Sequence, residues 1–397
     1  MKYNFKKFTA GIILLAVIVF ALSYAVFASY DVKILVDGER LESEISPIIK
    51  DGTTLVPMRD VFEGLGAVVS WDDQLRTASG TYKGVSVEIS PDDGSFSKNG
   101  ETIDLPVKPI IMHDRILVPL RAVAESFGYS VMWRGEDYTV SISTKPSMKT
   151  HFLDCGQADS IFIELPDRKC MLIDAAEAGF GKTLESFIYS KGYSHIDYIV
   201  ATHPHSDHIG GMEHILKSFS VGKFYMPEII HTTKTFERML DALKENGCEC
   251  IYIGQGSVIE DSIYDINVLA PLRQDYLRMN NYSAVIRLSY NNISTLFSAD
   301  AEIDSEREII ENNPDIQADI LKVGHHGSST STSEEYLDRV SPKDAIISVG
   351  TGNSYGFPDP LVEAKLNSRG INIHRTDFSG NICVTTDGYI YVIEGDK

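Results

Sequence analysis

One loop of the sequence carries four side chains that can bind a metal ion within six residues: His203, His205, Asp207 and His208. The mostly apolar residues 196–201 before the loop predict a buried strand, and residues 212–219 after it have the apolar spacing of a helix. Side chains two apart in an extended segment project to the same side, so His203 and His205 can share one ion. Asp207 and His208 lie past a bend and can reach a second point nearby. Imidazole and carboxylate ligands suit zinc, manganese or iron, whereas a solvated polar loop, the alternative, has no need of so many ligands.

Two later stretches of the chain add candidate ligands. Asp300 follows the apolar strand predicted for residues 293–298 and precedes the helical pattern of residues 302–312, so it suits a metal ligand or a helix N-cap. His325 and His326 follow another apolar strand, and two adjacent histidines at a strand end indicate a site. Ten of the eleven histidines lie in the last 249 residues, so the chemistry is expected there.

The composition limits the class of protein. The length of 397 residues predicts two or three domains, and the apolar fraction of 43% is ordinary for globular domains. The formal net charge of −20 disfavours a large nucleic-acid-binding surface, because contacts with phosphates need local lysine and arginine. Five cysteines are an odd number without a C-x-x-C pair, so mostly buried free thiols are expected rather than a disulfide framework.

The N-terminus has the pattern of an export sequence. Lysines among the first seven residues precede an uncharged apolar run over residues 8–30, and small residues offer a cleavage point after Ala28. The run is also long enough for a retained anchor, so residues 1–28 are expected to be a signal peptide or a membrane anchor. In both cases the rest of the chain is expected to be exported, either extracellular or anchored to the outer face of the cytoplasmic membrane. The cell envelope is then a partner.

The next part of the chain contains an internal repeat with an offset of 62 residues. From residue 47 to residue 71, 12 of 25 positions are identical to the residue 62 positions later; for example, Leu55-Val56-Pro57 recurs as Leu117-Val118-Pro119. The two tryptophans of the chain, Trp71 and Trp133, occupy equivalent positions, where core packing is the expected role.

Each copy of the repeat predicts a hairpin, a strand, a short helix ended by glycine, and a strand that carries the tryptophan. The helices are expected over residues 58–65 and 120–127. Two copies are too few for a solenoid, so a compact paired α+β module is expected. Residues 32–145 resemble the copper amine oxidase N-terminal-like domain, also called the stalk domain. The segment has a single histidine, His113, so no copper site is evident, and a spacer or surface-interaction role is expected.

The C-terminal part matches a longer series of motifs in order: D-x-G-Q at 154–157, T-H-x-H-x-D-H-x-G-G at 202–211, N-N-x-S at 280–283, Asp300, K-V-G-H-H-G-S at 322–328, S-T-S at 331–333, N-x-Y-G-x-P at 353–358 and R-T-D at 375–377. This series resembles the metallo-hydrolase domain of ComEC, the competence DNA-uptake channel protein, and its stand-alone relatives, which belong to the metallo-β-lactamase-fold hydrolases. The resemblance covers nearly all of residues 149–395, and the hydrolase domain is expected over residues 149–397. It implies an α+β chain whose C-terminal domain is a four-layer αβ/βα sandwich, with two sheets packed face to face and metals at one sheet edge.

The resemblance also implies a ligand set for two divalent metal ions, zinc or manganese. His203 and His205 would hold one ion, and Asp207, His208 and His325 would hold the other, with His326 as the alternative to His325. Asp300 would bridge the two ions. Asp207 would orient a metal-activated hydroxide or accept its proton, and Asn280 and Ser283 would bind polar groups of the substrate.

Two departures from the family pattern bear on activity. Asn280 and Asn281 stand where many metallo-β-lactamase-fold enzymes have a further histidine, as they do in ComEC relatives, so the first ion would be held more weakly. Phe357 replaces the histidine of the usual N-x-Y-G-H-P motif. If that imidazole serves as an acid or stabilises charge, turnover here is slower or the substrate differs.

The expected function is an exported metal-dependent hydrolase of the phosphodiesterase or nuclease type. Small phosphodiesters and short single-stranded nucleic acid suit the acidic chain better than long duplexes. One alternative is a hydrolase of a lactone, thioester or other carboxylic ester, which the same metal pair would serve. Another is a cell-surface binding protein without catalysis.

Overall fold

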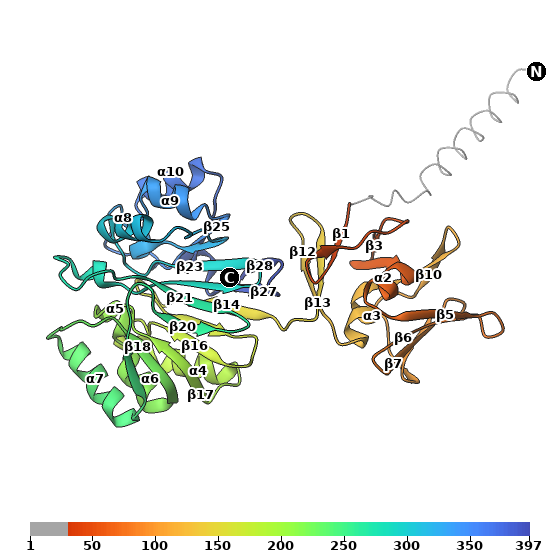
Figure 1. Ribbon diagram of the computed structural model, residues 1–397, viewed down its shortest axis with the longest axis horizontal. Coiled ribbons are helices and arrows are strands. Elements are labelled where there is room, and N and C mark those ends of the chain that lie inside the picture. The colour runs from red at the N-terminus through yellow and green to blue at the C-terminus, as the bar shows by residue number, and fades with distance from the viewer. Residues whose placement is uncertain (1–30) are drawn as a thin grey trace, which may run out of the picture. The chain divides into compact units, whose positions relative to one another are not determined.

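The computed structural model describes residues 31–397 (Figure 1). The export sequence predicted for residues 1–28 lies outside the described residues. The chain divides into two compact units, one ending at Ile142 and the other covering Ser143–Lys397. Among the described residues, the helices are too short or too polar to cross a bilayer.

The N-terminal unit contains three antiparallel or mixed sheets, with strand orders β12-β13-β1-β2, β10-β11-β4-β3 and β5-β6-β7-β8-β9. The strands of the first copy of the repeat are β1 (Lys33–Val36), β2 (Glu39–Arg40), β3 (Ile48–Lys50), β4 (Thr53–Pro57), β5 (Val68–Asp72), β6 (Thr77–Tyr82) and β7 (Val85–Ser90). Those of the second copy are β8 (Ser95–Lys98), β9 (Glu101–Thr102), β10 (Ile110–Met112), β11 (Arg115–Pro119), β12 (Ser130–Arg134) and β13 (Thr139–Ser143).

The two copies of the repeat share their sheets. Val56 of β4 lies opposite its repeat equivalent Val118 of β11, and β1 of the first copy pairs in parallel with β13 of the second. The expected paired module is therefore confirmed, because neither copy completes its sheets alone. The predicted helices are α2 (Met58–Gly64) and α3 (Leu120–Ser126), and each is followed by a glycine with positive φ, 79° at Gly66 and 87° at Gly128.

The expected core role holds for one tryptophan only. Trp133 is partly buried and packs against the core of the N-terminal unit. Trp71 is 42% exposed, so the expectation is wrong there. The reason is that β5 is an edge strand whose residues lie mostly in solvent, where the Trp71 indole donates to Asp73 at 2.7 Å.

The C-terminal unit has two mixed sheets, with strand orders β19-β18-β17-β16-β15-β14-β27-β28 and β20-β21-β22-β23-β24-β25-β26. The first sheet consists of β14 (Met148–Phe152), β15 (Ile161–Glu164), β16 (Cys170–Ile173), β17 (His195–Val200), β18 (Ser220–Met226), β19 (Glu249–Tyr252), β27 (Ile382–Thr386) and β28 (Tyr391–Gly395). The second consists of β20 (Val258–Asp261), β21 (Asp265–Ala270), β22 (Val285–Tyr290), β23 (Ile293–Phe297), β24 (Ile320–Lys322), β25 (Asp344–Ile347) and β26 (Asn372–Arg375).

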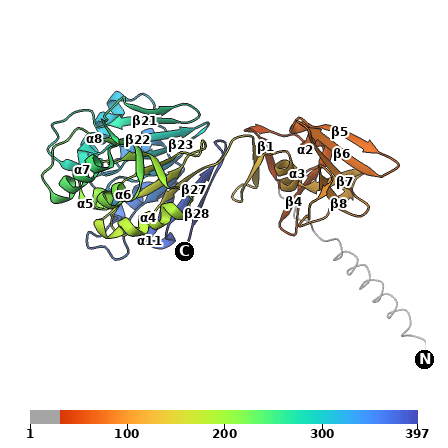
Figure 2. The same ribbon diagram turned by 90° about the horizontal axis from the view of Figure 1, so that it is seen from below.

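The two sheets pack face to face through a shared apolar core. Phe152 of the first sheet and Phe297 of the second are both buried, and their rings stack with centroids 6.0 Å apart. Helices α4 (Gly181–Ser190), α6 (Met212–Ser218) and α7 (Lys234–Asn246) cover the outer face of the first sheet (Figures 1 and 2). Helices α8 (Ile303–Asn312), α9 (Glu334–Val340) and α10 (Pro360–Ser368) cover the outer face of the second. The four-layer αβ/βα sandwich predicted from the sequence is confirmed.

The sheet topology also gathers the candidate ligands. Strand β17 runs parallel to β16, and β24 runs parallel to β23, so the carboxyl ends of each pair lie at one sheet edge. The loops that follow β17, β23 and β24 carry His203, Asp300 and the His325-His326 pair. Ligands bind beyond such strand ends in open α/β sheets.

The cysteines agree only in part with expectation. All five lie among the described residues and are free thiols, as predicted. Only Cys170 is fully buried, and Cys250 is exposed because β19 is an edge strand.

Candidate metal centre

The loop after β17 is held in a tight turn by its own backbone and by its neighbour. His205 precedes the short helix α5 (Ser206–Ile209), and its carbonyl accepts the N–H groups of His208 and Ile209 at 3.1 and 3.0 Å. Gly210 lies so close to the loop before α4 that a Cβ atom would lie 2.4 Å from the Ala178 nitrogen. Glycine is therefore required where this turn packs against the adjacent backbone.

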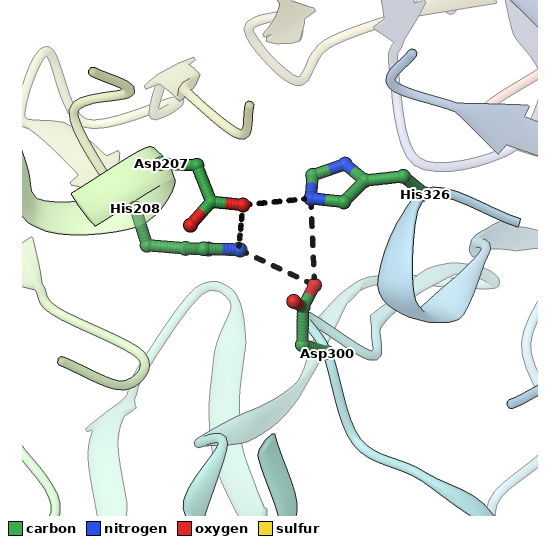
Figure 3. A group of neighbouring side chains, drawn as sticks. All are labelled: Asp207, His208, Asp300 and His326. Atoms are coloured by element: carbon green, nitrogen blue, oxygen red, sulfur yellow. Dashed lines mark ion pairs between the residues drawn. The ribbon is translucent and has the colours of Figure 1, made fainter. Parts of the chain in front are cut away.

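A first group of potential ligands consists of Asp207, His208, Asp300 and His326, whose ligand atoms all lie within 4.8 Å of one another (Figure 3). His208 Nε2 lies 3.3 Å from Asp300 Oδ1, and His326 Nε2 lies 3.3 Å from Asp207 Oδ2 and 3.7 Å from Asp300 Oδ1. The four side chains come from three separate loops and point toward one another.

A second group consists of His203, His205 and Asp300. His203 Nε2 lies 3.0 Å from His205 Nδ1 and 3.7 Å from Asp300 Oδ2. Asp300 thus presents Oδ1 to the first group and Oδ2 to the second, which is the position of a bridging carboxylate. Glu302, not Asp300, occupies the N-cap of α8, so the helix-cap alternative for Asp300 is excluded.

The unsatisfied atoms of the first group test whether a cation fits. Within residues 31–397, His208 Nε2, His326 Nε2 and Asp300 Oδ1 are buried and have no hydrogen-bond partner. Buried polar atoms without partners are rare and costly in native proteins, and an ion is one of the accepted explanations. Imidazole and carboxylate donors converging in this way fit a divalent metal ion.

The structure separates the two adjacent histidines. His326 belongs to the first group, whereas His325, favoured as the ligand in the sequence analysis, lies with Nε2 3.7 Å from Asp300 Oδ2 and Nδ1 3.2 Å from Thr330 Oγ1. Its side chain is 23% exposed. Both histidines have left-handed φ values, 47° and 54°, a strained backbone that is common at functional sites.

Two supporting residues escaped the sequence analysis. Asp174, at the end of β16, lies with Oδ2 2.7 Å from His208 Nδ1 and also accepts the Thr202 N–H and hydroxyl at 2.9 and 2.7 Å. Asp159 lies 2.8 Å from Lys322 Nζ, with both side chains buried, and 3.5 Å from His326 Nδ1. Asp174 could have been found because it follows an apolar strand, as Asp300 does. Asp159 could have been suspected because Lys322, a lysine inside an apolar strand, needs a carboxylate partner.

The carboxylates control the charge of the site. Burial opposes ionisation of Asp300, but the facing His208 and His326 hold the pKa of this carboxyl well below its ordinary value. Burial also opposes protonation of His208, yet Asp300 and Asp174 raise the pKa of this imidazole above its ordinary value. Burial, together with the nearby His208, holds the pKa of His203 well below its ordinary value. The site therefore attracts positive charge while His203 stays neutral, as a ligand must be.

The residues expected to act on the substrate have different surroundings. The Asp207 side chain is 28% exposed and can reach a bound molecule. Asn280 lies with Nδ2 3.4 Å from the His325 ring nitrogens, and its Oδ1 is buried without a partner among the described residues. Ser283 is fully buried, and its hydroxyl accepts the Asp300 N–H at 3.3 Å, which gives it a direct part in holding the Asp300 turn.

Comparisons with known proteins cover both units. Residues 153–351 match the metallo-beta-lactamase superfamily, and residues 35–142 match the copper amine oxidase N-terminal domain. The chain is 34% identical over 247 residues to ComE operon protein 3 of Bacillus subtilis, which covers 58% of this chain and 32% of that protein. It is 27% identical over 243 residues to competence protein ComA of Neisseria gonorrhoeae, which covers 57% of this chain and 30% of that protein. The chain thus spans about a third of the length of these relatives. Among solved structures, it is similar to the metallo-beta-lactamase fold protein YhfI of Bacillus subtilis, with a TM-score of 0.41 and 11% identity over 58% of this chain and 95% of that one.

Proposed function

Because the chain belongs to the metallo-beta-lactamase superfamily and carries a copper amine oxidase N-terminal domain before that part, we propose that it is an exported metal-dependent phosphodiesterase of the nuclease type. The observation that supports this proposal most strongly is the position of Asp300. Its two oxygens face two separate groups of ligands, His203 with His205, and Asp207 with His208 and His326. The resemblance to ComEC-like hydrolases deduced from the motifs is confirmed by the competence-protein relatives.

A pair of metal ions suits phosphodiester hydrolysis. Bound divalent ions supply a nucleophile at neutral pH by lowering the pKa of water and stabilise both oxygens of an in-line displacement at phosphorus. The competence-protein names of the relatives favour nucleic acid or a related phosphodiester over a β-lactam. The net charge of −20 favours short single strands or small diesters.

The side chains around the two ligand groups would then have different roles in hydrolysis. Asp207, the most exposed member of its group, would orient the attacking water and accept its proton on Oδ1, because Oδ2 faces His326 Nε2 and is the oxygen placed to bind an ion. Asp300 stays ionised beneath the reacting atoms, and Ser283 fixes its turn. His325, which is partly exposed, and Asn280, which is buried beside it, would donate to a phosphoryl oxygen.

The proposal includes export and a metal preference. The basic and apolar N-terminal sequence supports a location outside the cytoplasm, and the N-terminal unit would serve as a spacer or contact with the cell envelope. Four imidazoles and two carboxylates in the two groups support zinc or manganese.

The experiment uses purified residues 29–397. Bound metal is quantified by elemental analysis, and hydrolysis of bis(p-nitrophenyl) phosphate and of single-stranded DNA is measured with zinc or manganese added. We expect about two ions per chain and cleavage of both substrates that is abolished by chelation. Bound metal with cleavage of p-nitrophenyl acetate or a lactone, but of neither phosphodiester, would refute the proposal in favour of a carboxylic-ester hydrolase. Absence of metal and of all activity would favour a binding protein.

A further inference from the structure

The loop after β25 presents two aromatic side chains in a fixed arrangement. Asn353 braces this loop: its Nδ2 donates to the carbonyls of Gly350 and Phe357 at 3.0 and 2.7 Å, and its Oδ1 accepts the N–H groups of Tyr355 and Phe357 at 3.2 and 3.0 Å. The rings of Tyr355 and Phe357 stack, with centroids 5.6 Å apart and planes 18° apart. The two rings are therefore held parallel by the loop itself.

This loop lies directly against the metal centre. The Phe357 ring meets the His325 ring edge-to-face with centroids 5.7 Å apart, and His325 Nε2 lies 3.7 Å from Asp300 Oδ2. The turn of the histidine pair is also fixed to the loop, because the N–H of Asp359 donates to the Gly327 carbonyl at 2.8 Å. A continuous series of rings thus leads outward from Asp300 through His325 and Phe357 to Tyr355.

The outer ring is accessible and the inner one is supported. Tyr355 is 69% exposed, whereas Phe357 is partly buried and packs on the apolar core beneath α9 and α10. An exposed ring stacked on a supported ring offers a flat apolar face beside the metal centre. Every nucleobase has such a face, and stacking on aromatic side chains is a general way to bind single strands.

The charges near His325 make ring stacking more important for binding a nucleotide. Arg278 lies 3.2 Å from Glu302 Oε2, and Glu302 Oε1 lies 3.8 Å from His325 Nδ1, so the Arg278 guanidinium is already paired with a carboxylate. With a net charge of −20 as well, the chain has little electrostatic attraction for a polyanion. The proposed ions would attract the phosphate that is cleaved, but binding energy for the rest of an oligonucleotide would have to come largely from ring stacking.

We propose that Tyr355, supported by Phe357, stacks a nucleobase next to the cleaved phosphodiester and so selects nucleotide substrates. This inference rests on the proposed phosphodiesterase function.

The test compares oligothymidylates that carry one abasic tetrahydrofuran spacer, placed at each position in turn, with the intact oligomer. The metal-loaded full-length chain should lose about tenfold in kcat/KM when the spacer removes the stacked base. In the Tyr355→Ala variant, the ratio of kcat/KM for the intact oligomer to that for the spacer oligomer should fall to about twofold or less. Tyr355→Phe, which keeps the ring, should preserve the wild-type ratio. Tyr189→Ala, which removes an exposed tyrosine at the end of α4, is the matched control and should leave the wild-type ratio unchanged.

The outcomes separate the inference from the function on which it rests. A metal-loaded wild type that cleaves neither the oligomers nor bis(p-nitrophenyl) phosphate would overturn the phosphodiesterase proposal, and the stacking proposal with it. Cleavage of bis(p-nitrophenyl) phosphate but of no oligomer would overturn the stacking proposal alone. Cleavage that is insensitive to every spacer position, or a spacer effect that persists in Tyr355→Ala, would overturn only the proposal that Tyr355 stacks a nucleobase.

Discussion

The Asp174 carboxylate lies 2.7 Å from Nδ1 of His208, and both side chains are buried. This contact directs the opposite nitrogen, Nε2, toward Asp300. Carboxylates in this position fix the tautomer and the ring orientation of metal-binding histidines, and their replacement typically weakens metal binding 10–100-fold.

We therefore expect Asp174→Asn to weaken metal binding by about 10–100-fold, because an amide can donate to Nδ1 and favour the wrong tautomer. Competition with a chelating dye measures the affinity. Asp344→Asn is the matched control, since Asp344 bonds His374 at 2.8 Å in another Asp–His pair whose members belong to neither ligand group. Equal metal affinity in Asp174→Asn and wild type would contradict the positioning role.

The shared carboxylate predicts two different metal contents. Asp300→Ala should lose both ions, whereas His205→Ala should keep about one, because His205 belongs to a single group. Hydrolysis should fall more than about a hundredfold in both variants, since a direct ligand matters at least as much as a residue that orients one. Elemental analysis gives the stoichiometry.

Tryptophan fluorescence shows whether the N-terminal unit stays folded in the Asp300→Ala and His205→Ala variants. Both tryptophans of the chain, Trp71 and Trp133, lie in the N-terminal unit, so their emission reports that unit alone. Its unfolding transition should be unchanged. Full metal content in Asp300→Ala would refute the bridging assignment.

The buried ion pair between Lys322 and Asp159 predicts a large loss of stability on removal of one partner. Lys322→Met leaves the Asp159 carboxylate buried without its cation and should lower the free energy of unfolding by about 3–5 kcal/mol. The double variant Lys322→Met with Asp159→Leu should recover much of this loss, because no charge remains buried. Urea unfolding followed by circular dichroism measures the change. A single variant as stable as wild type would show that the pair is not important for folding.

A second polar pair predicts a pH dependence of stability. His151 Nε2 lies 2.7 Å from Glu164 Oε1 across β14 and β15. Burial acts to lower the pKa of His151, but Cys383 and Glu164 raise it above its ordinary value of about 6.5. A histidine whose pKa is higher in the folded than in the unfolded state stabilises the protein fully at a pH below its unfolded pKa. This stabilisation is lost as the pH rises through the folded pKa.

Glu164→Gln should thus destabilise the C-terminal unit more at pH 6 than at pH 9. The comparison is the difference in unfolding free energy between wild type and variant at each pH, in which titration of the other histidines cancels. If the destabilisation caused by Glu164→Gln grew toward pH 9, Glu164 could not be stabilising a protonated His151.

Local sequence determined much of this protein. The apolar strand before His203 and the helix after Gly211 adjoin the loop that carries the four ligands, so the apolar pattern and the spacing of residue types were enough to predict them as candidates. The 62-residue repeat predicted the hairpins and both helices of the N-terminal unit for the same reason. The motif series added the four-layer fold through the family that it resembles, because the motifs match that family in the same order along the chain.

The tertiary structure decided what depends on contacts between distant segments. The choice between His325 and His326 depends on two left-handed backbone angles, which no pattern of residue types specifies. Asp174 supports His208 from 34 residues away, and Asp159 meets Lys322 across 163 residues, through sheets that only the folded chain brings together. The sequence identified the candidate metal ligands because each of the three stretches that carry them has a local pattern of its own. Their orientation and their charge came from packing, because a buried carboxylate acts on whatever the fold places beside it.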